Sequence, residues 1–469
     1  MATDTGLRPH ADSATRRDGS GPDNRLSLLD HAGIQLVRAT GRKQLMQVAW
    51  IYEHPVDYER LEQFHRGLGY GLAGRRVERS VLPFGRHRWV SVPGPQAPLQ
   101  VSPRRRDRSE LSDWLDERAQ IPVDPERGPG WHVGVLPMTD GSTAITMVGS
   151  HNLGDGIAGV LSVLQAVNGT RPDFGYPPPR SRSRLRAAAA DLRLAARELP
   201  EAARVAAAAG KLILSSRGEP GPAAAGSAGR RDRGRCDCTV AVPAISIVVD
   251  VASWDARAEA LAGNSYSLLA GVAAKIGERM GRARASDGAV TLSIALNERT
   301  GLDDTRALAL SFAKASVDPA AVTTDLSGTR TTLRHALKEA REATDASLEL
   351  LPVVPWVPKG LLARYASQFH GSTEDLSVYC SNLGDLDAAV GRPDGTDAEY
   401  VLFRGVDQDF RRHDMEEAGG QLVVVAGRVN GKISIGITAY QLDSDNSKAR
   451  LREVAAQTLA EFELSGVID

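Results

Sequence analysis

The chain has 469 residues, and at roughly 150 residues per domain this length predicts two or three domains' worth of chain. Hydrophobic residues make up 42% and charged residues 25%, which excludes a wholly disordered, collagen-like or disulfide-scaffold protein. Lys and Arg number 57 against 58 Asp and Glu, so the strong basic excess of a nucleic-acid-binding protein is absent. The three cysteines are too few for a disulfide framework and fit a reducing compartment. No His, Cys, Asp and Glu group has metal-ligand spacing, so we expect no metal site.

The N-terminal residues 1–24 are polar and charged and contain glycine, which predicts a disordered leader. They lack the apolar stretch of a secretory signal. No run along the chain reaches about 18 consecutive apolar residues, the length that a membrane-spanning helix needs. We therefore expect a cytoplasmic protein whose contact with a membrane is at most peripheral.

The first half mixes strands and helices. Strand composition and helical periodicity predict, in chain order, a strand over Gln44–Tyr52, a helix over Val56–Gly69, strands over His132–Met138 and Thr143–Gly149, and a helix over Ile157–Val167. The two later strands flank Thr139-Asp140-Gly141-Ser142, a hairpin turn signal.

A compositional break separates the halves. Residues 180–235 contain twelve Arg and one Lys against five acidic residues, with many Ala. Leu185, Leu192 and Leu199 recur at heptad spacing, which predicts a helix that breaks near Pro200 and resumes through Leu214. Residues 217–235, rich in Gly, Pro, Ala and Arg, have no periodicity and predict a flexible loop. We interpret the helix as an interdomain crossover, with a membrane-surface role as the alternative.

The second half repeats the mixture. Its pattern predicts a helix over Ser265–Met280, a strand over Ala289–Ala295, a helix over Thr331–Ala346, a short strand over Leu376–Tyr379, a hairpin of Gln421–Val429 and Lys432–Ala439, and a helix over Ser447–Glu463. Asn430-Gly431 is the turn signal of that hairpin. Two α/β halves with antiparallel hairpins indicate two layered domains.

The strongest local feature is the run from Ser150 to Gly156, in which His151 follows a predicted strand and Asp155 and Gly156 precede an apolar helix. A strand end in a tight turn projects the imidazole from a rigid platform, and Gly154 and Gly156 allow close backbone approach or a positive φ. Asp155 has two possible uses: it caps the following helix, or it pairs with a cation elsewhere.

The spacing His151-x-x-x-Asp155-Gly156 resembles the HxxxDG motif of the CoA-dependent acyltransferase superfamily, which includes chloramphenicol acetyltransferase, condensation domains, polyketide-associated acyltransferases and the bacterial wax ester synthase/diacylglycerol acyltransferases. Other segments resemble the family in the same order. They are Leu26–Asp30 (LSLLD), Asn264–Arg279 (NSYSLLAGVAAKIGER), Ser293–Arg299 (SIALNER) and Ser381–Gly384 (SNLG). Many members carry a second histidine where this chain has Ser150, and the DFGWG motif of some branches is absent.

The resemblance implies a fold of two chloramphenicol acetyltransferase-like α/β sandwich domains that form a V with an active-site tunnel between them. The expected division is an N-terminal domain at 25–179, a helical crossover and loop at 180–235, and a C-terminal domain at 236–469. His151 is the implied general base. Asp155, Gly156 and Arg299 are implied as structural residues of the site, with Asp155 paired to Arg299, and Ser381, Asn382 and Gly384 as candidates for contacting the oxyanion or the substrate.

The implied reaction is direct acyl transfer from an acyl-CoA or acyl carrier protein thioester, used as co-substrate, to an alcohol, with no tightly bound cofactor. Two alternatives stay open: an amide-forming condensation-type enzyme that acts on an amine in natural-product biosynthesis, and a catalytically silent binding member of the same fold. A basic stretch that contains Trp89 is interpreted as a solvated face, with contact to CoA phosphates or an acidic carrier protein as the alternative. Its arginines are Arg75, Arg76, Arg79, Arg86, Arg88 and Arg104–Arg106.

Overall fold

The computed structural model describes residues 22–216, 238–342, 346–366 and 376–469. Nearly all of the predicted leader, and all of the predicted flexible loop at 217–235, lie outside these described residues. No helix in the described ranges is both long enough and apolar enough to cross a membrane.

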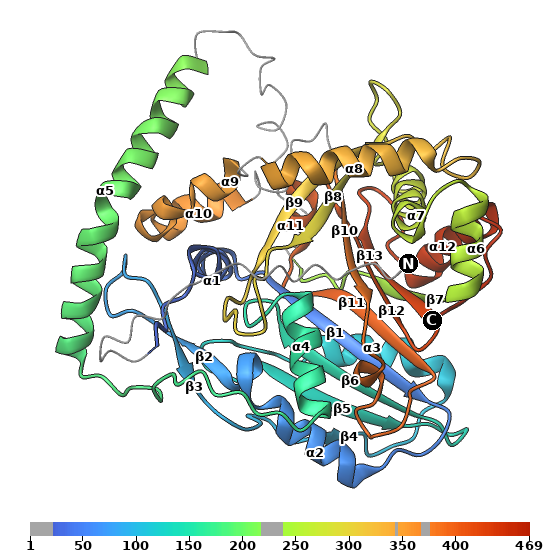
Figure 1. Cartoon of the computed structure of the whole chain (residues 1–469), viewed down its shortest axis with the longest axis horizontal. Coiled ribbons are helices and arrows are strands. Elements are labelled where there is room, and N and C mark those ends of the chain that lie inside the picture. The colour runs from blue at the N-terminus through green and yellow to red at the C-terminus, as the bar shows by residue number, and fades with distance from the viewer. Residues whose placement is uncertain (1–21, 217–237, 343–345, 367–375) are drawn as a thin grey trace.

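Helices and strands are interspersed along the whole chain (Figure 1). The helices are α1 (Leu28–Thr40), α2 (Tyr58–Leu68), α3 (Leu111–Ala119), α4 (Gly156–Val167), α5 (Arg184–Ser216), α6 (Val251–Ala260), α7 (Ser265–Arg279), α8 (Ser327–Glu342), α9 (Ala346–Glu349), α10 (Lys359–Ala366), α11 (Arg412–Glu417) and α12 (Lys448–Glu461). The strands are β1 (Lys43–Tyr52), β2 (Arg75–Glu78), β3 (Arg88–Ser91), β4 (Gln100–Val101), β5 (Trp131–Pro137), β6 (Thr143–Ser150), β7 (Ala244–Asp250), β8 (Val290–Asn297), β9 (Leu310–Val317), β10 (Val378–Asp385), β11 (Tyr400–Gln408), β12 (Gln421–Val429), β13 (Lys432–Tyr440) and β14 (Gly466–Ile468).

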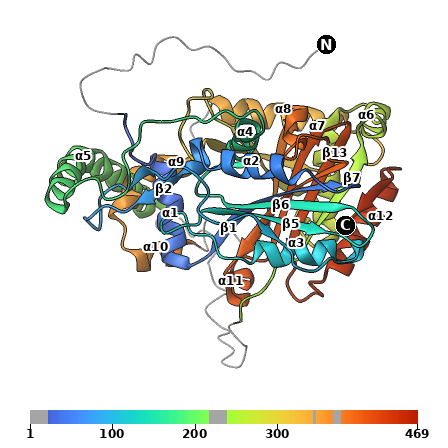
Figure 2. The same cartoon turned by 90° about the horizontal axis from the view of Figure 1, so that it is seen from below.

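The first half forms a five-stranded sheet in the order β11-β1-β6-β5-β4. Helices α2 and α4 cover one face of this sheet and α3 covers the other (Figures 1 and 2). The predicted hairpin is present: β5 and β6 pair antiparallel from Trp131 opposite Gly149 to Pro137 opposite Thr143. Gly141 in the turn has φ +90°, a conformation that glycine adopts at little cost.

The second half forms a seven-stranded sheet in the order β14-β7-β13-β12-β10-β8-β9. Its core joins this sheet to α6, α7, α8 and α12. The predicted hairpin of β12 and β13 is present, and Asn430 and Gly431 both have positive φ, at 50° and 74°, as a two-residue hairpin turn requires.

Strand β11 connects the two halves. It comes from the second half of the sequence but pairs along β1, from Lys43 opposite Gln408 to Ile51 opposite Tyr400, as the edge strand of the first sheet. Its other side approaches the second sheet so closely that a Cβ on Gly436 of β13 would lie 2.0 Å from the Phe403 carbonyl oxygen. The buried Arg404 strengthens this junction, because its Nη2 donates to Asp116 at 2.6 Å and to the Ala244 carbonyl at 2.7 Å.

The predicted elements are present with shifted ends, and two predictions are corrected. The short strand expected at Leu376–Tyr379 begins at Val378 and runs to Asp385, so it includes the segment from Ser381 to Gly384. The predicted break at Pro200 is wrong, because α5 continues through it. Pro200 removes one backbone hydrogen bond, but the surrounding Ala, Leu and Arg residues have high helix propensity.

Candidate active site

His151 lies in the turn between β6 and α4, where its backbone N–H donates to the Gln44 carbonyl of β1 at 3.1 Å. The residue is half-buried. Burial lowers the pKa of His151 below its ordinary value of 6.5, while the nearby Asp155 carboxylate and a hydrogen bond to its own backbone oppose this shift. The imidazole is therefore neutral at pH 7, which is the form that accepts a proton.

Asp155 serves both of the uses that the sequence leaves open. Its Oδ1 accepts from the Ala158 N–H at 2.9 Å and thereby caps α4. Its carboxylate also accepts from Arg299 Nη2, at 3.1 Å to Oδ1 and 3.0 Å to Oδ2, in an ion pair whose side chains are only 6% and 3% exposed. The pairing that the resemblance implies is thus present in the structure, and what the two residues contribute to activity stays a prediction.

A loop from the second half, residues 299–309, is held against this turn. Arg299 Nη1 donates to the carbonyls of Asp304 at 2.8 Å and Arg306 at 3.1 Å, so it shapes its own loop as well as binding Asp155. The Asp155 N–H donates to the Ala307 carbonyl at 2.9 Å, and Asp155 Oδ2 accepts from the Ala309 N–H at 2.8 Å. The turn that carries His151 therefore depends on a segment more than a hundred residues away.

A second carboxylate, Asp30 of α1, binds the same loop. Its oxygens accept from the Ala307 N–H at 3.1 Å and the Leu308 N–H at 2.8 Å, and its side chain is almost fully buried. Ser27 caps α1 by accepting from the Asp30 N–H at 3.0 Å. The spacing in Leu26–Asp30 thus has a physical basis, since Ser27 begins the helix and Asp30 in its first turn binds the loop. This role of Asp30 could not be predicted from the segment itself.

The structure also corrects the prediction for Arg75. The solvated-face interpretation is wrong for this residue, which is 1% exposed, with its guanidinium 3.8 Å from the Trp89 ring centroid. It donates to the Leu153 carbonyl at 3.1 Å and to the Thr305 carbonyl, so it binds the His151 turn and the 299–309 loop together. Burial lowers the pKa of Arg75 to about 10. Arg75 is followed by Arg76 in a basic stretch, and this local sequence does not predict a buried guanidinium.

The segment from Ser381 to Gly384 lies beside the His151 turn. A Cβ on Gly156 would lie 2.7 Å from Leu383 Cδ2. Side chains alternate along a strand, so Ser381 leaves β10 on the same face as Leu383, while Cys380 is buried in the core on the opposite face. Ser381 pairs with Val425 of β12, whose side chain packs on the core of the first half. Ser381 therefore lies on the face of β10 that packs toward the core of the first half, and its place beside His151 stays a prediction.

Asn382 and Gly384 shape the end of β10. The Gly384 N–H donates to Asn382 Oδ1 at 2.9 Å, Gly384 has φ +78°, and the pairing with β12 shifts register here. The Asn382 carbonyl oxygen is therefore engaged in the local turn. Ser381 Oγ makes no hydrogen bond to any residue that the structure describes. Among the described residues, Ser381 Oγ and Asn382 Nδ2 are therefore both free as donors, and we prefer Ser381 because it leaves β10 on the face that carries Leu383.

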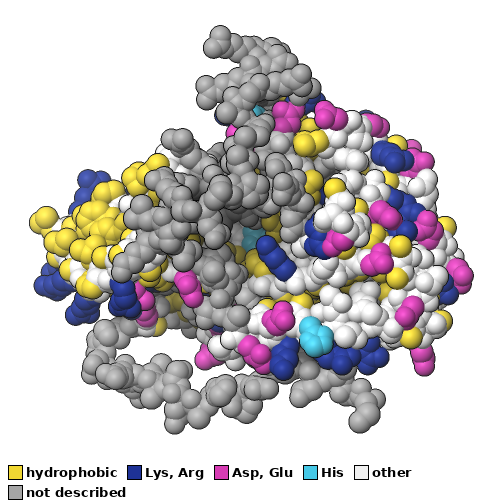
Figure 3. Space-filling model, turned by 90° about the horizontal axis from the view of Figure 1, so that it is seen from above, with side chains coloured by type: hydrophobic (Ala, Val, Ile, Leu, Met, Phe, Trp, Pro, Cys, Tyr) yellow, Lys and Arg dark blue, Asp and Glu magenta, His cyan; other side chains and the backbone are white. Residues whose placement is uncertain are grey.

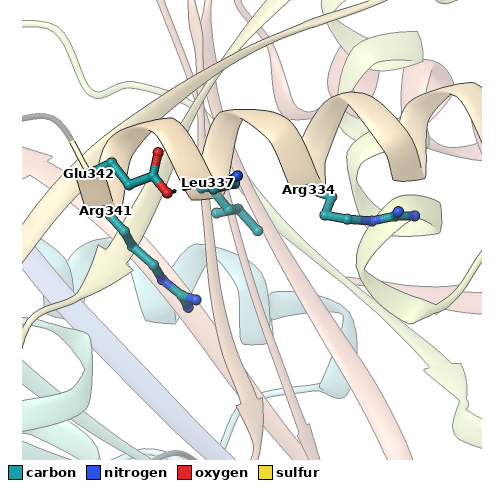
Figure 4. Close-up of a pocket in the computed structure, with 5 residues that line it drawn as sticks. Arg334, Leu337, Arg341 and Glu342 are labelled. Atoms are coloured by element: carbon teal, nitrogen blue, oxygen red, sulfur yellow. Dashed lines mark ion pairs between the residues drawn. The ribbon is translucent and has the colours of Figure 1, made fainter.

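Two cavities lie elsewhere and include neither His151 nor residues 381–384. A shallow one of about 300 Å³ lies along α8 and is lined by Arg334, Leu337, Lys338, Arg341 and Glu342 (Figure 4). Another of about 240 Å³ is lined in part by Tyr70, Arg75 and Arg171. The tunnel between the domains therefore stays a prediction.

Solved structures of other proteins share this architecture. The first condensation domain of the CDA synthetase superposes with a TM-score of 0.53 at 13% identity, covering 96% of this chain and 100% of that chain. The chain has the fold of the CoA-dependent acyltransferases and condensation domains. The wax ester synthase/diacylglycerol acyltransferase from Marinobacter aquaeolei VT8 superposes with a TM-score of 0.51 at 15% identity, covering 94% and 98% of the two chains. Trichothecene 15-O-acetyltransferase from Fusarium sporotrichioides superposes with a TM-score of 0.53 at 11% identity, covering 98% and 99%.

No family model and no curated protein sequence matches the chain. At these identities the similarity of the solved structures shows the condensation-domain fold and carries no further assignment. The predicted fold class is confirmed, and the two domains of this fold correspond to the two sheets described above. The domain boundaries at 179/180 and 235/236 stay predictions.

Gly156 offers a direct test of the contact between the two halves. Neither Gly154 nor Gly156 has a positive φ, so both glycines instead allow neighbouring side chains to pack closely against the backbone. Gly156→Ala is expected to push the tip of Leu383 aside and to lower the free energy of unfolding by about 1–3 kcal/mol, measured by denaturant titration. Leu383→Ala in the same chain should recover part of this loss, whereas additive losses would place Leu383 away from the His151 turn.

Proposed function

We propose that the protein is an acyltransferase that moves an acyl group from the thioester of an acyl-CoA, or of an acyl carrier protein, to an alcohol. The observation that carries this proposal is the half-buried, neutral His151 on a turn that both halves of the chain position, within the condensation-domain fold. Residues Asp155, Arg299 and Asp30 hold the turn and the loop, and none of them is assigned a proton-transfer role.

The proposed step is direct. His151 accepts the proton of the acceptor hydroxyl as that oxygen attacks the thioester carbonyl, and a tetrahedral oxyanion forms. The C–S bond then breaks, the acyl–oxygen ester remains, and the leaving thiolate takes the proton back from the imidazolium. General-base catalysis of this kind contributes about 10²–10⁴-fold in rate. The Ser381 hydroxyl is the proposed donor to the oxyanion, and such a donor is worth about 2.7–4 kcal/mol.

An amine acceptor is the second candidate, because the same base serves an attacking nitrogen and would give an amide. The test is a panel of acyl-CoAs combined with primary alcohols or primary amines, with free thiol release followed in solution and products identified by mass spectrometry. Ester formation in wild type but not in His151→Ala supports the proposal. Amide products alone would replace the alcohol with an amine, and thiol release equal in both proteins, or none with CoA and carrier-protein thioesters alike, would contradict it.

A further inference from the structure

Helix α5 presents two different faces. One face packs on the protein through Ala187, Leu194, Ala195 and Ala202, which are buried. The other carries Leu185, Leu192 and Leu199, which are 84%, 57% and 48% exposed. The leucine spacing of seven residues keeps them in one row along the helix, with the exposed Ala189 and Ala196 between them and the exposed Ala203 and Ala207 continuing the row after Leu199. We call this row of leucines and alanines the outer stripe.

The inner face of α5 is fixed by its acidic residues. Buried Asp191 accepts from Arg88 Nη2 at 3.2 Å and from Ser80 Oγ at 2.6 Å, and Glu198 pairs with Arg86 at 2.7 Å. These arginines belong to the basic stretch of the first half, so they are ion-paired and do not form a free solvated face. The ion pairs set the rotation of α5, which keeps the outer stripe directed away from the body of the protein.

Arginines line one edge of the outer stripe. Arg186, Arg193, Arg197 and Arg204 are spaced by seven, four and seven residues and are all exposed. They lie about 100° around the helix from the leucine row. Within the part of the chain that the structure describes, none of their guanidinium groups pairs with a carboxylate. In the space-filling view, hydrophobic side chains with Lys or Arg beside them gather at the end of the molecule where α5 lies (Figure 3).

We propose that the outer stripe of α5 docks on an anionic lipid surface. Exposed leucines in a row beside unpaired arginines are the features of a helix that lies in a membrane interface, where apolar side chains enter the acyl boundary and cations meet the headgroups. The proposal is independent of the acyltransferase function. It replaces the plain crossover interpretation of this helix with a binding role.

A second copy of the chain fits this surface less well. In an antiparallel pair of α5 helices the same edge of each helix meets its counterpart, so the arginine row would face another arginine row, which is repulsive. In a parallel pair the row would face the opposite edge, and Asp191, Ala195 and Ala202 on that edge are already buried against the protein. Anionic headgroups complement the arginine row in either direction.

The experiment is co-sedimentation of the full chain with vesicles of phosphatidylcholine alone or with 40% phosphatidylglycerol. Wild type is expected to partition onto the anionic vesicles at least about tenfold more strongly than onto the neutral ones, and high salt should weaken this. Leu185→Ser/Leu192→Ser/Leu199→Ser is expected to lower the partition coefficient about tenfold or more. Arg193→Gln/Arg197→Gln/Arg204→Gln is expected to lower it by roughly 100-fold.

Matched control variants distinguish binding through the outer stripe from effects of overall surface hydrophobicity and net charge. Val101→Ser/Leu302→Ser/Val467→Ser removes three side chains that are 45%, 68% and 57% exposed elsewhere. Arg60→Gln/Arg66→Gln/Arg450→Gln removes three charges from other helices, where the side chains are 63%, 53% and 45% exposed. Both controls should partition as wild type does, and since all variants change exposed side chains, their thermal unfolding midpoints should stay close to wild type.

Three results would overturn the proposal. They are a wild-type protein that does not bind anionic vesicles, α5 variants that bind as well as wild type, and controls that lose as much binding as the α5 variants. A dimer in light scattering that the leucine variant dissociates, without vesicle binding by wild type, would instead identify a second copy of the chain as the occupant.

Discussion

Replacing Asp155 with alanine is expected to destabilise the protein by about 3–5 kcal/mol and to abolish acyl transfer. The substitution leaves Arg299 with its guanidinium buried and without its carboxylate. It also removes the acceptor of the Ala309 N–H and the cap of α4. The stability loss is read from the midpoint and slope of denaturant unfolding, beside activity.

Two further variants separate the parts of this effect. Asp155→Asn keeps an oxygen for the α4 cap but loses the charge, so its cost should be smaller than that of the alanine variant. Asp155→Ala/Arg299→Ala removes both charges, and its loss should fall short of the sum of the single losses by at least about 0.5 kcal/mol. A stable, fully active Asp155→Ala protein, or strict additivity in the cycle, would show that the ion pair does not hold the turn.

Replacing His151 with alanine is expected to lower kcat by about 100-fold or more, because it removes the proposed proton acceptor. The side chain is only half-buried and caps nothing, so the unfolding free energy should stay within roughly 1 kcal/mol of wild type. Activity and stability therefore separate in this variant, whereas they fall together in Asp155→Ala. His413→Ala on α11, whose side chain is 66% exposed, is the matched control and should be fully active. Wild-type turnover in His151→Ala would remove His151 from the mechanism.

The pH dependence of wild type tests the same assignment. Burial holds the pKa of His151 below 6.5, so the neutral, proton-accepting form persists to lower pH than for a free histidine. The rate constant kcat/KM should be level above pH 6.5 and should fall on acidification, with a midpoint below 6.5. A midpoint above 6.5, or an acid limb that persists in the residual activity of His151→Ala, would assign the titration to another group.

Part of this site can be predicted from the sequence, because its elements depend only on residues close together in the chain. The strand before His151, the hairpin turn at Asp140-Gly141 and the apolar helix after Gly156 each follow from periodicity and turn chemistry over short stretches. The pairing of Asp155 with Arg299 was reached only through the resemblance. Nothing in either segment alone indicates which distant cation a carboxylate meets.

Other contacts of the site cannot be predicted from sequence, namely those of Asp30 and Arg75 with the 299–309 loop. Both side chains bind backbone groups of residues 305–308, and a backbone N–H or carbonyl carries no residue-specific signal. Arg75 is charged and lies in a basic stretch, so the local sequence predicts a side chain exposed to solvent. Burial over the Trp89 ring and two backbone acceptors reverse that expectation once the chain folds.

The α/β class, most elements, both hairpin turns and the His151 motif can be predicted from sequence, since these depend on side-chain period and on backbone preferences within a few residues. Long-range packing determines that β11 leaves its own half to pair with β1, that Leu383 of β10 lies against Gly156 while Cys380 enters the core of the second half, and that the leucine row of α5 lies outside. Each of these depends on which of two faces meets a partner far away in the chain. A periodic pattern defines the faces, and long-range packing chooses between them.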